Sequence, residues 1–337
     1  MGAVRVLSEA DVRALVTPAD ARVAVEEGFR DLANGVSKMA PRITVPIPEA
    51  GGNIRMLPAV RVLAAPRRMP PPPAYVGVKI YTGYVGPAFK DMSKDRFTVL
   101  LYDYADGTLL AIIAARWLGA MRTGATSAVA TRHMARPDAR VLGIIGTGEQ
   151  AETQVLNVAT LMQPARVLAW SKDPDTARAA FAARLAAAGV TVESAESAEA
   201  VARAADVLCL ATTSRQPVVQ TAWVRPGTHV NAVGANLANR REVETSLVRA
   251  ARVVVEFRPQ ALQEAGDLVV PIQAGEIGED VIAAELGEVV TGAKPGRTAP
   301  DEITLFKSIG VAIEDVALAA WLYERAVAQD IGQVVKL

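Results

Sequence analysis

The chain of 337 residues is poor in the residues that disulfides and metal sites need. It contains one cysteine, Cys209, and two histidines, His133 and His229. One thiol cannot form an internal disulfide, and the apolar stretch "DVLCLATT" around it favours a buried, inert residue. Neither histidine has a further ligand at metal-binding spacing, so we expect no metal site. A lone thiol is typical of a reducing compartment, and we therefore expect a cytoplasmic protein.

An excess of one charge and aromatic residues are also lacking. Lys plus Arg number 36, as do Asp plus Glu, so the formal net charge is zero, and aromatic residues make up 5%. Nucleic-acid surfaces need basic and stacking side chains, so we expect no nucleic-acid partner. No apolar run reaches the ~18 residues of a membrane-spanning helix, so we expect no membrane partner. The length and the 51% hydrophobic content instead predict a globular protein of two domains.

The first third of the chain predicts an α+β region. Helices are expected after Ser8 and after Thr17, where Asp20 can complete a capping box. The stretches "RITVPIP", "NIRMLPA", "YVGVKIYT" and "FTVLLYDY" alternate as strands do, and the "DG" at 106–107 predicts a hairpin turn. We therefore expect an antiparallel sheet, followed by a helix over residues 115–135 that connects two domains.

From residue 141 onward, short apolar strands alternate with helices, which predicts a parallel sheet with helices on both faces. "VLGIIGTGEQA" (141–151) contains G-x-G-x-x-A between a strand and a helix, the context of a dinucleotide-binding turn. Gly146 would form the tight turn, Gly148 would let the backbone approach a pyrophosphate, and Ala151 would allow close helix packing. Residues 304–328 are expected to end the chain as one long helix.

The end of the second strand of this region bears on the choice of cofactor. An acid there would hold the ribose 2′-hydroxyl of NAD, but the chain has Ser171 and Lys172 after "RVLAW". Lys172 can pair with a 2′-phosphate, and neither position carries a carboxylate to repel it. We therefore favour NADP(H) as the cofactor. NAD(H) stays open, because Asp173 follows directly.

Five stretches together resemble the ornithine cyclodeaminase/mu-crystallin family over roughly residues 40–325: "VGVKIYTG", "LGAMRTGATSAVAT", "IGTGEQA", "NAVGANLANRREVE" and "DEITLFKSIGVAIEDVALA". The family includes ornithine and lysine cyclodeaminases, archaeal-type alanine dehydrogenases and cyclic ketimine reductases. The resemblance implies a substrate-binding and dimerisation domain of residues 1–122 and 305–337. It implies a Rossmann-type doubly wound domain, residues 123–304, inserted into it, and a homodimer joined through the antiparallel sheets.

The resemblance also implies roles for individual residues. Arg42 and Arg122 would hold the substrate carboxylate, and Arg122 would also contact the cofactor. Lys79 would be the active-site lysine, and Met56 would be a wall of the pocket. Arginine suits a carboxylate because its planar group donates two parallel hydrogen bonds. Further cofactor or substrate contacts are expected, in chain order, at Thr123, Thr147, Glu149, Gln150, Thr212, Val233, Gly234, Arg240, Ser308 and Ile309.

Two positions depart from the cyclodeaminases of this family. Asn236 stands where those enzymes carry an aspartate, and Lys94 in "MSKDRF" stands where a Thr/Ser-His pair is frequent. Cyclodeamination needs several proton transfers, and an amide cannot take up a proton near neutral pH. Reduction of an imine needs fewer proton transfers, because Lys79 can protonate the imine nitrogen while Asn236 hydrogen-bonds to the substrate or the nicotinamide.

We therefore expect an NAD(P)H-dependent reductase whose substrate is a small imine bearing a carboxylate, such as a cyclic ketimine. Two alternatives stay open. One is an ornithine or lysine cyclodeaminase that releases ammonia from an amino acid with catalytic NAD⁺. The other is a non-catalytic protein that binds a ligand in the presence of NADPH.

Overall fold

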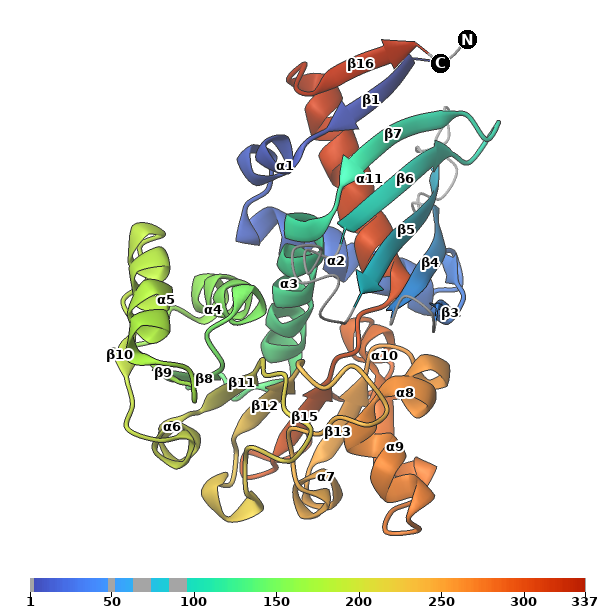
Figure 1. The fold of residues 1–337 in the computed structure, drawn as a ribbon. Helices are drawn as coiled ribbons and strands as arrows, with labels where there is room; N and C mark the ends of the chain where they lie inside the picture. Colours follow the sequence, from blue (N-terminus) through green and yellow to red (C-terminus); the bar gives the residue numbers. More distant parts are fainter. Residues whose placement is uncertain (1–2, 48–51, 63–73, 85–95, 337) are drawn as a thin grey trace. The chain divides into compact units, whose positions relative to one another are not determined.

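The computed structural model describes residues 3–47, 52–62, 74–84 and 96–336. The chain forms two compact units, Met1–Arg122 with Val311–Leu337, and Thr123–Gly310 (Figure 1). The second unit continues to residue 310 rather than ending at 304, because Thr304–Lys307 form a strand of its sheet. Among the described residues, no helix is both long and apolar enough to cross a membrane.

An antiparallel sheet is the centre of the first unit, as predicted. Its strand order is β16-β1-β7-β6-β5-β4-β2, with β3 also paired to β4, and β1–β7 is its one parallel pair among the described strands. The strands are β1 (Ala3–Leu7), β2 (Lys38–Met39), β3 (Ile43–Ile47), β4 (Gly52–Val62), β5 (Ala74–Tyr84), β6 (Arg96–Asp103), β7 (Leu109–Ala114) and β16 (Gln333–Lys336). The sequence had not predicted the two terminal strands, β1 and β16.

The helices of this unit begin where the sequence predicts. Ser8 caps α1 (Glu9–Leu15), and Thr17 caps α2 (Pro18–Ala33) in a capping box with Asp20. The helix predicted over 115–135 is α3 (Arg116–Met134), and the boundary between the two units falls within it.

The helix α11 (Ala312–Ala328) lies against the sheet, where it contacts β4, β5 and β6 (Figure 1). The two come very close at Gly77, where an added Cβ would lie 2.7 Å from the Val316 side chain. Strand alternation places Tyr75, Lys79 and Tyr81 on this buried face. A lysine is thus carried into the apolar interface between sheet and helix.

The second unit contains a parallel sheet in the order β10-β9-β8-β11-β12-β15-β13-β14. Its strands are β8 (Val141–Ile145), β9 (Arg166–Trp170), β10 (Glu193–Ser194), β11 (Val207–Leu210), β12 (His229–Ala232), β13 (Arg252–Val255), β14 (Ile282–Glu285) and β15 (Thr304–Lys307). Its helices are α4 (Glu149–Met162), α5 (Asp175–Ala187), α6 (Ala198–Ala204), α7 (Thr245–Ala250), α8 (Arg258–Glu264), α9 (Gly266–Gln273) and α10 (Leu286–Val290), with short 3₁₀ turns at Thr221–Trp223 and Glu279–Val281. The direction in which successive strands are added changes at β8: β9 and β10 lie on one side of it, and β11 and the later strands lie on the other.

The long helix predicted over residues 304–328 is wrong in its first part. Residues 304–307 form β15 in the interior of the sheet, and the helix begins only at Ala312. Gly310 separates the two elements with a φ of +74°, a conformation that interrupts a helix.

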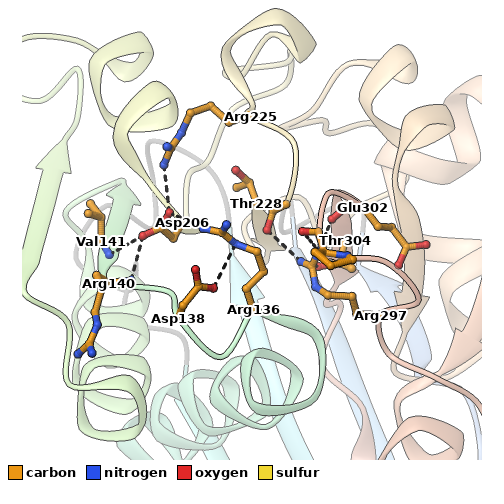
Figure 2. A network of polar contacts seen from close by, with 12 residues as sticks. Arg136, Asp138, Arg140, Val141, Asp206, Arg225, Thr228, Arg297, Glu302 and Thr304 are labelled. Atoms are coloured by element: carbon orange, nitrogen blue, oxygen red, sulfur yellow. Dashed lines mark hydrogen bonds and ion pairs between the residues drawn. The ribbon is translucent and has the colours of Figure 1, made fainter.

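A polar network joins the amino ends of the parallel strands (Figure 2). The carboxylate of Asp206 forms ion pairs with Arg136 and Arg225 and accepts hydrogen bonds from two amides at the start of β8. Arg297 donates to the hydroxyl of Thr304 at the start of β15. These contacts occupy the amino edge of the sheet. The carboxyl edge is where ligands bind in sheets of this type.

Candidate functional site

The turn after β8 has the geometry that the glycine pair predicts. Gly146 has a φ of +116°, and an added Cβ would lie 2.3 Å from the carbonyl oxygen of Ala211, so only glycine fits. Gly148 begins α4 without a side-chain cap, and no atom lies within 4 Å of the position its Cβ would take. This open space at the positive end of a helix fits a pyrophosphate.

The loop after β9 brings an acid toward this turn. The carboxylate of Asp173 accepts hydrogen bonds from Thr147 Oγ1 at 2.8 Å and from Ser171 Oγ at 3.0 Å. The Lys172 side chain is exposed to solvent. The strand end that lacks an acid therefore acquires one from Asp173, because the chain bends at residues 172–173 and the Asp173 amide donates to Ser171 Oγ.

The turns after β11 and β12 are joined by a residue that sequence reasoning missed. Glu242 is fully buried and accepts hydrogen bonds from the amides of Thr212, Gly234 and Ala235. Asn236 follows in the same turn and is half-buried. Val233 is buried directly after β12.

The turn after β15 is held in the same way. Buried Glu256 accepts hydrogen bonds from Ser308 Oγ at 2.6 Å and from the Ile309 amide at 2.7 Å. The Arg240 amide donates to the carbonyl oxygen of Leu237 within the turn that follows Asn236. The predicted residues Thr212, Gly234, Ser308 and Ile309 therefore all lie in turns at the carboxyl edge of one sheet.

The first unit contains a buried cluster of four charged side chains, Lys79, Arg122, Glu314 and Asp315. Lys79 Nζ lies 2.8 Å from the carboxylate of Asp315, and Arg122 Nε lies 3.0 Å from the same carboxylate. Arg122 Nη1 donates to Glu314. Both acids belong to the first turn of α11, where the helix dipole favours negative charge.

Burial and neighbouring charges make Lys79 a weaker base than an ordinary lysine. Burial lowers the pKa of Lys79 from 10.5 to about 8, and the charges of Arg122 and Arg42 act in the same direction. Asp315 opposes them. A lysine with this pKa is protonated at neutral pH and can still lose its proton in a reaction step.

The strand register separates Met56 from this cluster. Met56 pairs with Ile80 across β4 and β5, whereas Lys79 pairs with Leu57. Paired residues share a face of the sheet, and adjacent residues point to opposite faces. Met56 therefore lies on the face opposite Lys79 and does not form a wall beside it. Lys94 lies outside the described residues.

The predicted site residues thus fall into two sets. Arg42, Met56, Lys79 and Arg122 belong to the first unit, and the positions from Thr123 to Ile309 belong to the second. Glu149 and Gln150 stand in the first turn of α4. The first unit contains a buried charge cluster, and the second contains a sheet edge whose glycine turn fits a nucleotide.

Cys209 and His229 are both fully buried in the parallel sheet. Burial raises the pKa of the Cys209 thiol to about 12 and lowers the pKa of His229 to about 3, so both stay neutral at physiological pH. Within the described ranges, no three His, Cys, Asp or Glu side chains are grouped to hold a metal ion.

The parallel sheet, the change in strand order at β8 and the glycine turn define a Rossmann-type nucleotide-binding protein. The family expected from the sequence is confirmed, because the model of the ornithine cyclodeaminase/mu-crystallin family matches residues 3–330. The chain belongs to this family.

Similar proteins include reductases and a dehydrogenase. Alanine dehydrogenase of Archaeoglobus fulgidus is 32% identical over 331 residues, which are 98% of each chain. Δ1-pyrroline-2-carboxylate reductase of Bacillus cereus is 36% identical over 264 residues, 77% of this chain and 80% of the relative. The structure of Thermococcus litoralis Δ1-pyrroline-2-carboxylate reductase in complex with NADH and L-proline has a TM-score of 0.90, with 35% identity over 98% of this chain and 100% of that chain.

Proposed function

We propose that the protein is an NAD(P)H-dependent reductase of imines that carry a carboxylate, with cyclic ketimines as the preferred class. An NAD(P)-dependent enzyme is the class to which its named relatives belong. The observation that carries the finer proposal is the buried Lys79, which has a carboxylate partner, two arginines nearby and a pKa lowered to about 8.

Lys79 would act as the proton donor. In its ammonium form it gives a proton to the imine nitrogen, and the nitrogen keeps that proton in the amine product. When bound, the reduced nicotinamide supplies the hydride that the imine carbon accepts. Asp315 holds Lys79 Nζ in place, and their ion pair forms again once the neutral amine has taken up a proton from water.

Arg42 would be the principal anchor for the substrate carboxylate. Arg122 was predicted to share this role, but two of its nitrogens face Glu314 and Asp315. An arginine bound to two carboxylates has less of its fork to offer to a third. Arg122 therefore supports the acids that position Lys79, and Arg42 takes the larger part in substrate binding.

A cyclodeaminase is a weaker proposal. Asn236 provides no titrating group, and the two acids of the buried charge cluster, Glu314 and Asp315, are engaged with Arg122 and Lys79. An alanine dehydrogenase fits the same residues, because reductive amination of pyruvate also passes through a carboxylate-bearing imine. The relative from Archaeoglobus fulgidus supports testing that substrate.

Both NADH and NADPH are proposed as cofactors. Lys172 supports a 2′-phosphate, as the sequence led us to favour, but the Asp173 carboxylate beside Ser171 repels one and can accept a ribose hydroxyl. These opposing charges favour the use of both NADH and NADPH. The ratio of kcat/KM with NADPH to kcat/KM with NADH should fall in Lys172→Ala and rise in Asp173→Ala.

We further propose that residues 1–122 with 311–337 bind the substrate and form a homodimer, while residues 123–310 bind the cofactor. The outer face of the antiparallel sheet is apolar, and Ile43 and Val45 are exposed by 48% and 46% in the single chain. A second copy would cover this face. The mass of the protein in solution, measured by light scattering, tests the dimer.

The function is tested by following oxidation of NADH and NADPH with Δ1-pyrroline-2-carboxylate, Δ1-piperideine-2-carboxylate, and pyruvate plus ammonia. A parallel assay measures ammonia release from ornithine and lysine with NAD⁺. Lys79→Ala is the control, and it should abolish turnover while leaving NADH binding intact. Turnover of ornithine without reduction of any imine would replace the proposal, and cofactor binding without any turnover would favour a binding protein.

A further inference from the structure

One buried carboxylate fixes the carboxyl ends of two neighbouring strands, β11 and β12. Glu242 Oε1 accepts a hydrogen bond from the Thr212 amide at 2.8 Å. Its Oε2 accepts from the amides of Gly234 at 2.6 Å and Ala235 at 3.0 Å. The two turns are far apart in sequence, and this side chain connects them directly.

Glu242 is itself held by a second buried group. Asp267 Oδ1 accepts hydrogen bonds from the amides of Glu242 and Val243 at 2.7 and 3.1 Å. Asp267 Oδ2 lies 3.0 Å from Lys307 Nζ, which also donates to the carbonyl oxygen of Ala232 at 3.2 Å. The three charged side chains are fully buried, so water does not loosen these contacts.

The turn at Gly234 is shaped to admit the carboxylate. An added Cβ at Gly234 would lie 2.1 Å from the Thr212 carbonyl oxygen and 2.5 Å from Glu242 Oε1. The ion pair of Lys307 is with Asp267 rather than with Glu242, and burial raises the pKa of Glu242 to about 7. Burying a carboxylate is costly unless it is fully hydrogen-bonded, so the arrangement needs all three amides.

The position of these turns in the sheet indicates what they serve. In sheets of this type a dinucleotide lies across the carboxyl edge at the point where the strand order changes direction, with its phosphates at the glycine turn after the first strand, here β8. Asp173 marks the side of β9 as the place for one ribose. The other half of the dinucleotide then extends over the turns after β11 and β12, where Glu242 holds the backbone.

We propose that Glu242 is a positioning residue for the nicotinamide half of the cofactor, because it presets the two turns on which that half lies. This inference rests on the proposed use of NADH or NADPH. It predicts that the turns are ordered before the cofactor arrives, so that binding does not have to order them.

The test variant is Glu242→Gln, which keeps the size of the side chain. A carboxamide has one acceptor oxygen, so its NH₂ group must face an amide N–H of one of the two turns. Glu244→Gln is the matched control: Glu244 also accepts a backbone hydrogen bond, from Thr221 at 2.8 Å, but lies outside both turns. If Glu242→Gln does not fold, Glu242→Asp keeps the charge and is too short to reach both turns.

The first measurement is hydrogen exchange in the cofactor-free protein, which does not depend on activity. The amides of Thr212, Gly234 and Ala235 should exchange about tenfold faster or more in Glu242→Gln, because a hydrogen bond to a charged group is lost. They should be unchanged in Glu244→Gln. Unchanged exchange at all three amides in Glu242→Gln would overturn the inference.

The second measurement compares the Kd of NADH, NADPH and ADP. In Glu242→Gln the Kd of the two dinucleotides should rise about tenfold, and the Kd of ADP, which lacks the nicotinamide half, should not change. Equal weakening of all three ligands, or of none, would overturn the positioning role. Wild-type protein that binds neither dinucleotide would refute the proposed function and, with it, the role in binding, while exchange still reports whether Glu242 holds the turns.

Discussion

Asp315→Asn should make turnover fail at a lower pH than in the wild-type enzyme. Lys79 must be protonated to donate to the imine nitrogen, so activity declines as the pH rises through the pKa of Lys79. Burial, Arg122 and Arg42 lower that pKa to about 8, and Asp315 opposes them. Removing the charge of Asp315 leaves only the effects that lower the pKa.

The charges of the cluster set the size of the effect. Lys79, Arg122, Glu314 and Asp315 carry two positive and two negative charges, so the neutralised variant is left with one excess positive charge. Loss of an opposite charge in direct contact changes a pKa by about 1 to 3. With a fall of about 2, the protonated fraction of Lys79 at pH 7 drops from about 90% to about 10%, a loss of roughly tenfold.

The assay is the pH profile of kcat/KM for the imine. The midpoint of the basic limb should move to lower pH, and activity should recover as the solution is acidified. Glu324→Gln is the control, because Glu324 belongs to the same helix and accepts a hydrogen bond from Tyr75 at 2.7 Å, away from the cluster. Thermal unfolding of both variants reports any loss of fold, which is expected when one partner of a buried pair is removed. A basic limb that does not move would refute Lys79 as the titrating donor or Asp315 as its partner.

Four further variants have expected outcomes. Gly146→Ala should lower the free energy of unfolding by more than about 1 kcal/mol, because its φ of +116° and the 2.3 Å contact exclude a side chain; Gly148→Ala should leave unfolding unchanged and raise the Kd of NADH. Asp173→Ala should improve kcat/KM with NADPH relative to NADH, as measured with both cofactors at one imine concentration. Arg42→Ala should raise KM for the imine by about 10- to 100-fold with a smaller change in kcat, in steady-state assays.

Local patterns were sufficient for much of the fold. The caps at Ser8 and Thr17, the alternation around Lys79 and the glycine turn at Gly146 each depend on a few adjacent residues, and each is found where the sequence places it. β15 was missed because "TLFK" continues into the apolar pattern of the following helix. Its strand conformation comes from pairing with β12 and β13, which no local pattern contains.

The path of the chain decides two positions that the sequence misplaced or left open, Met56 and Asp173. Leu57 shares the face of Lys79, and its neighbour Met56 points to the opposite face. Only the pairing of β4 with β5 shows which of the two faces each residue takes. Asp173 follows a strand end that lacks an acid, and a turn brings its carboxylate back to the Ser171 hydroxyl. The sequence could therefore name Asp173 as a possible acid beside the ribose, whereas the face on which Met56 lies needed the register of the sheet.

The buried acids of the first unit, Glu314 and Asp315 among them, and Glu242 of the second unit differ in whether the sequence could have revealed them. Glu314 and Asp315 stand in "VAIEDVALAAW", an apolar helix with no other charge nearby, and burial of such a helix demands cations for them. Lys79 and Arg122, each in a stretch of small or apolar residues, are matching cations. Glu242 gives no such signal, because "NRREVET" reads as a solvated turn. Its burial is created by the turns after two other strands, so the carboxylate could be assigned only from the fold.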